Sequence, residues 1–169
     1  MDISVIGGAP GRGTLIWRGQ SYPCTLGRSG VCADKREGDG ASPAGCFPLR
    51  AVFYRADRMD KPSTRLPCSA IARDDGWCDA PADPAYNRKV RLPYPASAET
   101  MWRDDTLYDI VVVLGHNDDP VVPGAGSAIF LHLMRDDGGP TEGCVGVERA
   151  LALELVRSLG PGDRVCIGM

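Results

Sequence analysis

Two residues in the sequence have the chemistry and the spacing of a nucleophile and its base. Cys144 lies in the segment PTEGCVGV, 12 residues after His132, which lies in the strand-like segment AIFLHLM. A thiol becomes a nucleophile when a neighbouring imidazole accepts its proton. Gly143 would let the backbone turn sharply and expose its N–H groups. A helix is predicted a few residues later, and its positive end would favour the thiolate if the two lay close together. These features favour a Cys–His pair.

Other interpretations of Cys144 stay open from the residues alone. It could form half of a disulfide, bind a metal or pack as a small apolar side chain. A metal site is the weakest of these, because zinc sites need paired ligands at short spacing and no Cys-x-x-Cys occurs. We therefore expect no metal and no other cofactor. His132 could equally be a core histidine that bonds to the backbone.

The cysteine content gives two opposing indications of where the protein works. Seven cysteines favour an oxidising compartment, although an odd number leaves at least one thiol over. The N-terminal segment MDISVIGGAPGRG has no basic or apolar signal region, so it predicts no secretory leader. Apart from Cys144, six cysteines could form up to three disulfides of unknown pairing: Cys24, Cys32, Cys46, Cys68, Cys78 and Cys166.

Length and charge restrict the class of protein further. The 169 residues predict one domain, residues 1–169, and we expect a monomer. A net charge of −3 with scattered basic residues gives no support for nucleic-acid binding. The longest apolar runs have the length of a buried strand, so we expect no membrane span.

Short apolar runs separated by many glycines and prolines predict a mainly β fold. A helix is predicted in VERALALELVRSLGPGD, ended by a left-handed Gly160 and by Pro161. A second, shorter helix is predicted around Ser97 to Arg103, and residues 55–94 are predicted to form a long surface excursion. The expected strands are Ile3 to Ile6, Thr14 to Arg18, Ser21 to Leu26, Cys46 to Tyr54, Asp109 to Leu114, Ala128 to Met134 and Arg164 to Ile167.

Two motifs in order resemble the L,D-transpeptidase (YkuD-type) catalytic domain. The run GSAIFLHLMRDDGGPTEGCVGV resembles its catalytic segment, a strand ending in His, a loop and then Ser/Thr-His-Gly-Cys. The run DKREGDGASPAGCFPLR resembles its K…G…TP-x-G-x-F-x-(I/L) element, and with LGHND the similarity covers roughly the whole chain. The resemblance implies a mainly β fold, a mixed β-sheet or β-sandwich with one or two flanking helices.

The resemblance also implies a peptidoglycan L,D-transpeptidase. Cys144 would attack the carbonyl of meso-diaminopimelate in a donor stem peptide, and the side-chain amine of an acceptor stem would resolve the thioester to give a cross-link. The cross-link would join the third residues of two stem peptides, or the first residue of one stem to the third residue of another. His132, oriented by the carbonyl of Leu133, would act as base and then as acid, beside an oxyanion hole at Gly143 and Cys144. Such an enzyme would work in the periplasm. The alternatives are an L,D-carboxypeptidase that trims stems with water, and a non-catalytic wall-binding module.

The sequence departs from the family pattern at two positions. Glu142 stands where the family has a histidine, and His116 is the expected substitute. Gly146 stands where the family commonly has an arginine, which leaves Arg135, Arg149 and Lys35 as candidates for carboxylate recognition. The expected catalytic residues are Cys144, His132, Gly143 and His116.

The segment DDGWCDAPADPAYNRKV is the expected wall of the substrate site, because Trp77 and Tyr86 offer flat apolar surfaces and Asn87 and Arg88 offer polar contacts. An ordinary loop fixed by its aromatic residues is an equally good interpretation. The expected substrate-binding residues are Thr141, Glu142, Asn117, Trp77, Tyr86, Lys35 and Arg135.

Overall fold

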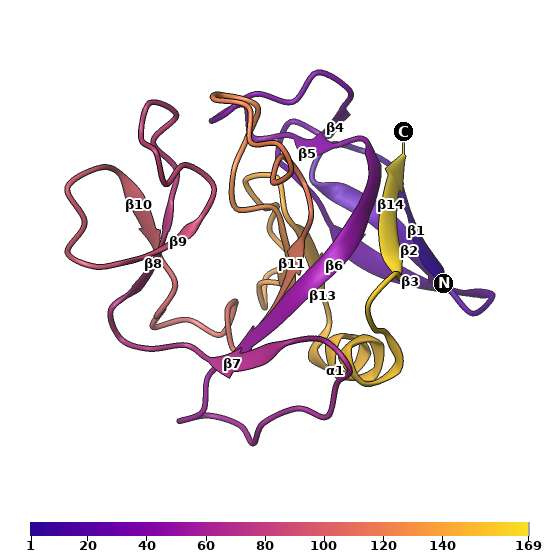
Figure 1. The fold of residues 1–169 in the computed structure, drawn as a ribbon. Coiled ribbons are helices and arrows are strands. Elements are labelled where there is room, and N and C mark those ends of the chain that lie inside the picture. The colour runs from indigo at the N-terminus through magenta and orange to yellow at the C-terminus, as the bar shows by residue number, and fades with distance from the viewer. Residues whose placement is uncertain (169) are drawn as a thin grey trace.

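The structure is a computed structural model, which describes residues 1–168 (Figure 1). All seven strands expected from the sequence are present and correspond to β1, β2, β3, β6, β11, β12 and β14. The mainly β prediction is confirmed. The strands are β1 (Asp2–Gly7), β2 (Arg12–Trp17), β3 (Gln20–Thr25), β4 (Val31–Cys32), β5 (Ser42–Pro43), β6 (Gly45–Tyr54), β7 (Cys68–Ala70), β8 (Asp75–Cys78), β9 (Lys89–Arg91), β10 (Ala98–Thr100), β11 (Ile110–Leu114), β12 (Phe130–Leu133), β13 (Val145–Val147) and β14 (Arg164–Gly168).

The main sheet closes on itself. Its strand order is β11-β12-β13-β3-β2-β1-β14-β6-β7, and β11 also pairs with β6. Most neighbours are antiparallel, but three pairs are parallel: β12 with β13, β1 with β14, and β6 with β7. Every residue of β11 and β12 is buried, which explains why their sequences are continuous apolar runs and do not alternate. Within the sheet, β12 and β13 are direct neighbours.

The one α-helix described in residues 1–168 is α1 (Arg149–Ser158), which lies beside the closed sheet (Figure 1). Its predicted apolar stripe is confirmed, because Leu151 and Leu155 are buried in the core. The predicted left-handed cap at Gly160 is wrong. Leu159 ends the helix in an extended conformation, and the side chain of Asp163 accepts a bond from Gly160 N–H at 2.9 Å. No helix in the described chain is long and apolar enough to cross a membrane.

The second predicted helix, Ser97 to Arg103, is also wrong. Residues 98–100 form β10, which pairs with β8 in a small sheet of order β10-β8-β9. All four residues of β8 are buried, so residues 55–94 are not simply a surface excursion. In residues 98–100, pairing with β8 determines the strand conformation and overrides the weak local helix propensity.

The cysteines form one disulfide among the described residues. Cys46 of β6 and Cys166 of β14 are register partners and are bonded to each other. The six candidate cysteines could have formed three bridges, but only this one is present among the described residues. Cys144 and the other four candidates are free thiols; these four are Cys24, Cys32, Cys68 and Cys78.

Candidate functional site

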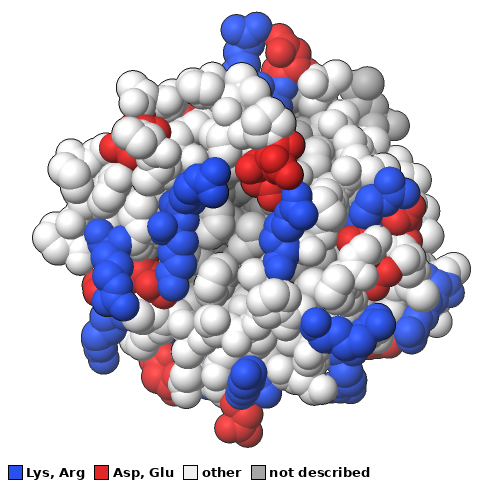
Figure 2. All heavy atoms as spheres, viewed as in Figure 1, with Lys and Arg blue, Asp and Glu red and all other residues white. Residues whose placement is uncertain are grey.

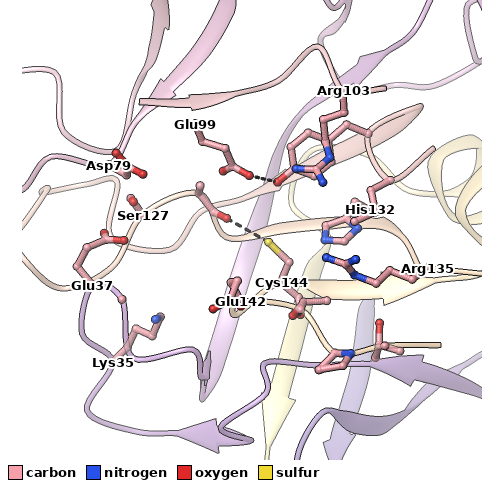
Figure 3. Close-up of a pocket in the computed structure, with 18 residues that line it drawn as sticks. Lys35, Glu37, Asp79, Glu99, Arg103, Ser127, His132, Arg135, Glu142 and Cys144 are labelled. Carbon is pink, nitrogen blue, oxygen red and sulfur yellow. Dashed lines mark hydrogen bonds between the residues drawn. The ribbon is translucent and has the colours of Figure 1, made fainter. Parts of the chain in front are cut away.

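Cys144 and His132 line the same cavity, which has a volume of about 350 Å³ (Figure 3). The strand register brings them together. Cys144 directly precedes β13, and His132 of β12 is the parallel partner of Gly146. Alternate residues of a strand face opposite sides, so Cys144 and His132 share a face while Val145 points into the main core. At Gly146, which stands at the family's usual arginine position, a Cβ would overlap Thr25 Oγ1, so a side chain there would collide with β3.

The imidazole of His132 is held in one orientation. Its Nδ1 lies 2.7 Å from the carbonyl oxygen of Leu133, and because a carbonyl can only accept, Nδ1 carries the proton and Nε2 has a free lone pair. The ring packs edge-on against Tyr108, with centroids 5.3 Å apart. The residue is 4% exposed, and burial lowers the pKa of His132 to about 4. His132 is therefore a neutral, oriented base.

The thiol of Cys144 does not point to this base at rest. It donates to the carbonyl oxygen of Ala128 at 3.2 Å and accepts a bond from Phe130 N–H at 3.4 Å. Burial raises the pKa of Cys144 to about 12. The condition for help from the helix dipole is not met, because the whole of β13 separates Cys144 from the start of α1. At rest Cys144 is a neutral thiol.

Gly143 and Thr141 shape the turn that carries the thiol. Gly143 has a φ of +137°, and a Cβ there would lie 2.8 Å from the carbonyl oxygen of Ala41, so only glycine fits. The hydroxyl of Thr141 donates to the carbonyl of Cys144 at 2.7 Å and accepts from Gly143 N–H at 3.2 Å. Thr141 thus fixes the turn and also lines the cavity.

Glu142 lines the cavity but points largely into solvent. Its side chain is 77% exposed and forms an ion pair with Arg28 at 3.2 Å. An exposed pair of this kind contributes about 0–1 kcal/mol to stability. The residue that replaces the family's histidine is therefore a surface carboxylate with a basic partner.

His116 and Asn117 are not among the residues that line the cavity in residues 1–168. One ring nitrogen of His116 lies 2.9 Å from the carbonyl oxygen of Ala125. The side chain of Asn117 donates to the carbonyls of Val122 and Gly126, both at 2.9 Å. Both residues fix the loop before β12, so His116 does not occupy the position expected of a substitute for the missing histidine.

Trp77 and Tyr86 support the site from behind. They are buried and do not line the cavity. Their polar atoms form hydrogen bonds inside the protein. The indole N–H of Trp77 donates to Asn87 Oδ1 at 2.9 Å, and the hydroxyl of Tyr86 donates to Glu37. Trp77 and Tyr86 thus fix the expected substrate wall from inside, and Asp79 is the residue of that segment that lines the cavity.

Two of the basic candidates line the cavity and one does not. The ammonium group of Lys35 is buried in an ion pair with Asp39, while Arg135 is exposed at the cavity edge. Arg149 pairs with Asp109 and lies outside the cavity. Arg135 is therefore the candidate best placed for carboxylate recognition.

Several cavity residues were not predicted from the sequence. Arg103 and Tyr108 line it on the side of His132, and three carboxylates line it elsewhere: Glu37, Asp79 and Glu99. They come from separate loops and strands, so no spacing along the chain could have revealed them. Tyr108 alone had a signal, because it lies two residues before the strongly predicted strand β11.

A second cleft, of about 290 Å³, lies where β6 and β11 meet the small sheet. Phe53, Trp77 and Phe130 contribute to its apolar lining, and Arg50 and Lys89 contribute basic groups. Figure 2 shows basic side chains on both sides of a hollow in the face that presents β6. Phe130 connects the two sites, because its backbone N–H bonds Cys144 Sγ.

Within the described residues, no group of three or more His, Cys, Asp or Glu side chains is arranged to hold a metal ion. No curated protein matches the chain. Residues 11–167 match the model of the YkuD family, the L,D-transpeptidase catalytic domain. That match spans nearly the whole sequence and includes every residue that lines the cavity of Cys144 and His132. The chain therefore belongs to the L,D-transpeptidase catalytic-domain family.

Proposed function

We propose that this protein is a peptidoglycan L,D-transpeptidase with Cys144 as the nucleophile and His132 as the base. Members of its family are cysteine-nucleophile transpeptidases. The observation that carries the proposal is the bond from His132 Nδ1 to the carbonyl of Leu133, which leaves Nε2 free as a base in the cavity that contains Cys144. A neutral imidazole can accept the proton of a neutral thiol.

Acylation begins with the release of the thiol from Ala128. Rotation about the Cα–Cβ bond turns Cys144 toward His132, whose Nε2 takes the proton as sulfur attacks the carbonyl of meso-diaminopimelate. A C–S bond forms and the carbonyl oxygen becomes an oxyanion, stabilised by the N–H groups of Cys144 and Gly143. Each such donor contributes about 3 kcal/mol to lowering the barrier. The tetrahedral intermediate then expels the following residue as an amine, which takes the proton from His132.

Resolution of the thioester determines whether the enzyme joins or trims stems. An acceptor amine attacks the thioester, His132 accepts its proton, the C–S bond breaks and the thiol of Cys144 is restored. With water as the acceptor the same steps give an L,D-carboxypeptidase. Arg103 and Arg135, which lie on the His132 side of the cavity, support binding of the donor's carboxylates by charge complementarity (Figure 3).

The test uses purified muropeptides of defined stem length and mass spectrometry of the products. Wild type should form an acyl-enzyme and dimers, while Cys144→Ala should form neither. His132→Gln should acylate about 10²–10⁴-fold more slowly. Shortened monomers without dimers would identify a carboxypeptidase, and fragment masses of the dimers would assign the cross-link. A wild-type protein that binds muropeptides without acylation would be a wall-binding module.

The proposed place of action is the periplasm, since domains of this family typically act on the cell wall outside the cytoplasm. The disulfide between Cys46 and Cys166 agrees with an oxidising compartment. Fractionation of cells that express the full gene, with alkylation of free thiols before lysis, would test the proposal. Recovery of the reduced protein in the cytoplasmic fraction would contradict it.

A further inference from the structure

Three carboxylates gather on one side of the catalytic cavity. Figure 3 shows Glu37, Asp79 and Glu99 on one side of Cys144, where Lys35 also lies, paired with Asp39, and shows Arg103 and Arg135 on the other side with His132. The carboxylates come from three places, the loop before β5, the residue after β8 and strand β10. We call these three residues and Ser127 the acidic wall.

The acidic wall is held in place by buried tyrosines. The hydroxyl of Tyr86, which is 2% exposed, donates to Glu37, and the hydroxyl of Tyr108 donates to Glu99 at 2.6 Å. Such second-layer bonds fix a charged group before a ligand arrives. None of the three carboxylates has a salt-bridge partner within residues 1–168, whereas Arg103 is paired with Asp105. The wall therefore presents positioned carboxylates that form no ion pair of their own, since the neighbouring Lys35 is paired with Asp39.

Two polar atoms of the acidic wall are buried and have no hydrogen-bond partner. They are Oδ1 of Asp79 and Oγ of Ser127, a residue that is 9% exposed. The Ser127 hydroxyl lies near that of Tyr86 but makes no well-directed bond with it. An unsatisfied buried polar atom is costly, so such atoms commonly mark the place of a ligand. Both residues line the cavity that contains Cys144.

The ligand that fits this wall is a primary ammonium group. It carries one positive charge and three donors, which suits several spread acceptors such as the carboxylates and Ser127 Oγ. A divalent metal would need its ligands gathered around one point, and the described residues offer no such cluster. Mutual repulsion of the carboxylates also favours a cation, and burial together with Asp79 and Glu37 raises the pKa of Glu99.

We propose that the acidic wall binds the ammonium group of the acceptor stem and selects amine acceptors over water. The inference rests on the proposed transpeptidase function. The ammonium group binds on the side of Cys144 opposite His132 and passes one proton to a carboxylate of the wall. The freed amine attacks the thioester and forms the C–N bond as its second proton moves to His132. The C–S bond breaks, and the thiolate of Cys144 takes that proton back.

Three variants test the proposal by comparing acylation by the donor with transfer to the acceptor. Asp79→Asn, Glu37→Gln and the double variant keep the shape of the wall and remove charge. Asp34→Asn, an exposed carboxylate outside the cavity, is the matched control. We expect transfer from the acyl-enzyme to the cationic acceptor to fall at least tenfold in the double variant, while acylation by the donor changes far less. Transfer to hydroxylamine, which is largely uncharged at neutral pH, should be preserved. Equal losses with both acceptors, or no loss, would overturn the proposal.

A binding measurement separates this inference from the proposed function. Calorimetry on Cys144→Ser uses meso-diaminopimelate and its di-N-acetyl derivative, which lacks the ammonium charges. The free amino acid should bind at least tenfold more weakly when Asp79→Asn and Glu37→Gln are added. The affinity for the acetylated form should not change with either substitution. Unchanged affinity for the free amino acid would refute the ammonium site, even in an active enzyme. Absence of acylation in wild type would instead refute the proposed function.

Discussion

The thiol of Cys144 donates a hydrogen bond to the carbonyl oxygen of Ala128, at 3.2 Å, and not to His132, the proposed base. Ala128 is held there by the bond from its N–H to Asn87 Oδ1, at 3.0 Å. A thiolate could not donate to that carbonyl, so the contact stabilises the protonated form. The resting site is thus a neutral thiol beside a neutral imidazole, and activation requires the thiol to leave Ala128.

The first prediction concerns the reactivity of Cys144 without substrate. Only the thiolate is alkylated, and a pKa of about 12 leaves very little thiolate at pH 7. Iodoacetamide should therefore label Cys144 at least about 100-fold more slowly than free cysteine, whose pKa is about 8.5. The rate should still be rising at pH 10. Peptide mapping by mass spectrometry distinguishes Cys144 from the other thiols, and a plateau below pH 8 would indicate a thiolate–imidazolium pair instead.

The second prediction concerns Asn87, which connects the small sheet to the catalytic strand. Its side chain bonds Trp77 Nε1, Ala128 N–H and the carbonyls of His116 and Asn117. Asn87→Ala leaves these buried groups without partners, at about 1–3 kcal/mol for each lost partner. We expect a loss of at least about 4 kcal/mol in the free energy of unfolding, from four such groups, and slower acylation, because Ala128 is no longer fixed. Urea denaturation measures the first effect. Arg88→Ala, next in sequence and exposed, is the control.

The elements most easily predicted were those with strong local patterns. Strands β11 and β12 read as continuous apolar runs because both of their faces are covered, and α1 shows a clear apolar stripe. Strands β8, β9 and β10 have three or four residues each and lie among prolines and charged residues. Pairing between distant segments creates them, and a single segment contains no sign of that pairing.

That Cys144 and His132 share a cavity could be predicted, because a resemblance singled out both residues. The acidic wall could not, since Glu37, Asp79 and Glu99 converge only through the fold. Trp77 was assigned to the substrate surface because aromatic residues in a polar segment often bind ligands. Its indole N–H instead finds a buried partner in Asn87, a relationship that the sequence spacing does not reveal.

The third prediction concerns Gly143. Gly143→Ala places a Cβ 2.8 Å from the carbonyl of Ala41 at a φ of +137°, which side chains rarely adopt. The turn must shift, and the thiol and its oxyanion donors shift with it. We expect acylation to fall at least about 100-fold, the effect of a displaced catalytic group, with a smaller loss of thermal stability. Gly168→Ala, where a Cβ would have nothing within 4 Å, should match wild type in both measurements.

The fourth prediction concerns the disulfide between Cys46 and Cys166, which closes a loop with a sequence separation of 120. A cross-link over so long a loop restricts the unfolded chain strongly, and removing a native disulfide costs about 2–5 kcal/mol. Cys46→Ser should lower the free energy of unfolding by that amount, and a reducing agent should destabilise wild type but not the variant. Cys32→Ser, which removes a free thiol, should show little change. Equal stability of wild type with and without reductant would contradict this prediction.

The fifth prediction concerns the acid sensitivity that His132 gives to the fold. Burial lowers the pKa of His132 from 6.5 to about 4, so the unfolded chain binds a proton between these values and the native state does not. Protonation of His132 in the unfolded chain therefore costs the native state no stability above pH 6.5, and the free energy of unfolding declines as the pH falls toward 4. By pH 5 the loss from this group is about 2 kcal/mol, since one pKa unit corresponds to about 1.4 kcal/mol.

His132→Gln removes that titration while keeping a side chain that can donate to the carbonyl of Leu133. The variant should lose about 2 kcal/mol less free energy of unfolding between pH 7 and pH 5 than wild type does. Urea denaturation at both pH values measures the difference. His116 is present in both proteins, so its own titration cancels, and His116→Gln should leave the contribution of His132 in place. Parallel stability curves for wild type and His132→Gln would show that His132 is exposed to protons in the native state, which would rule out its role as a buried neutral base.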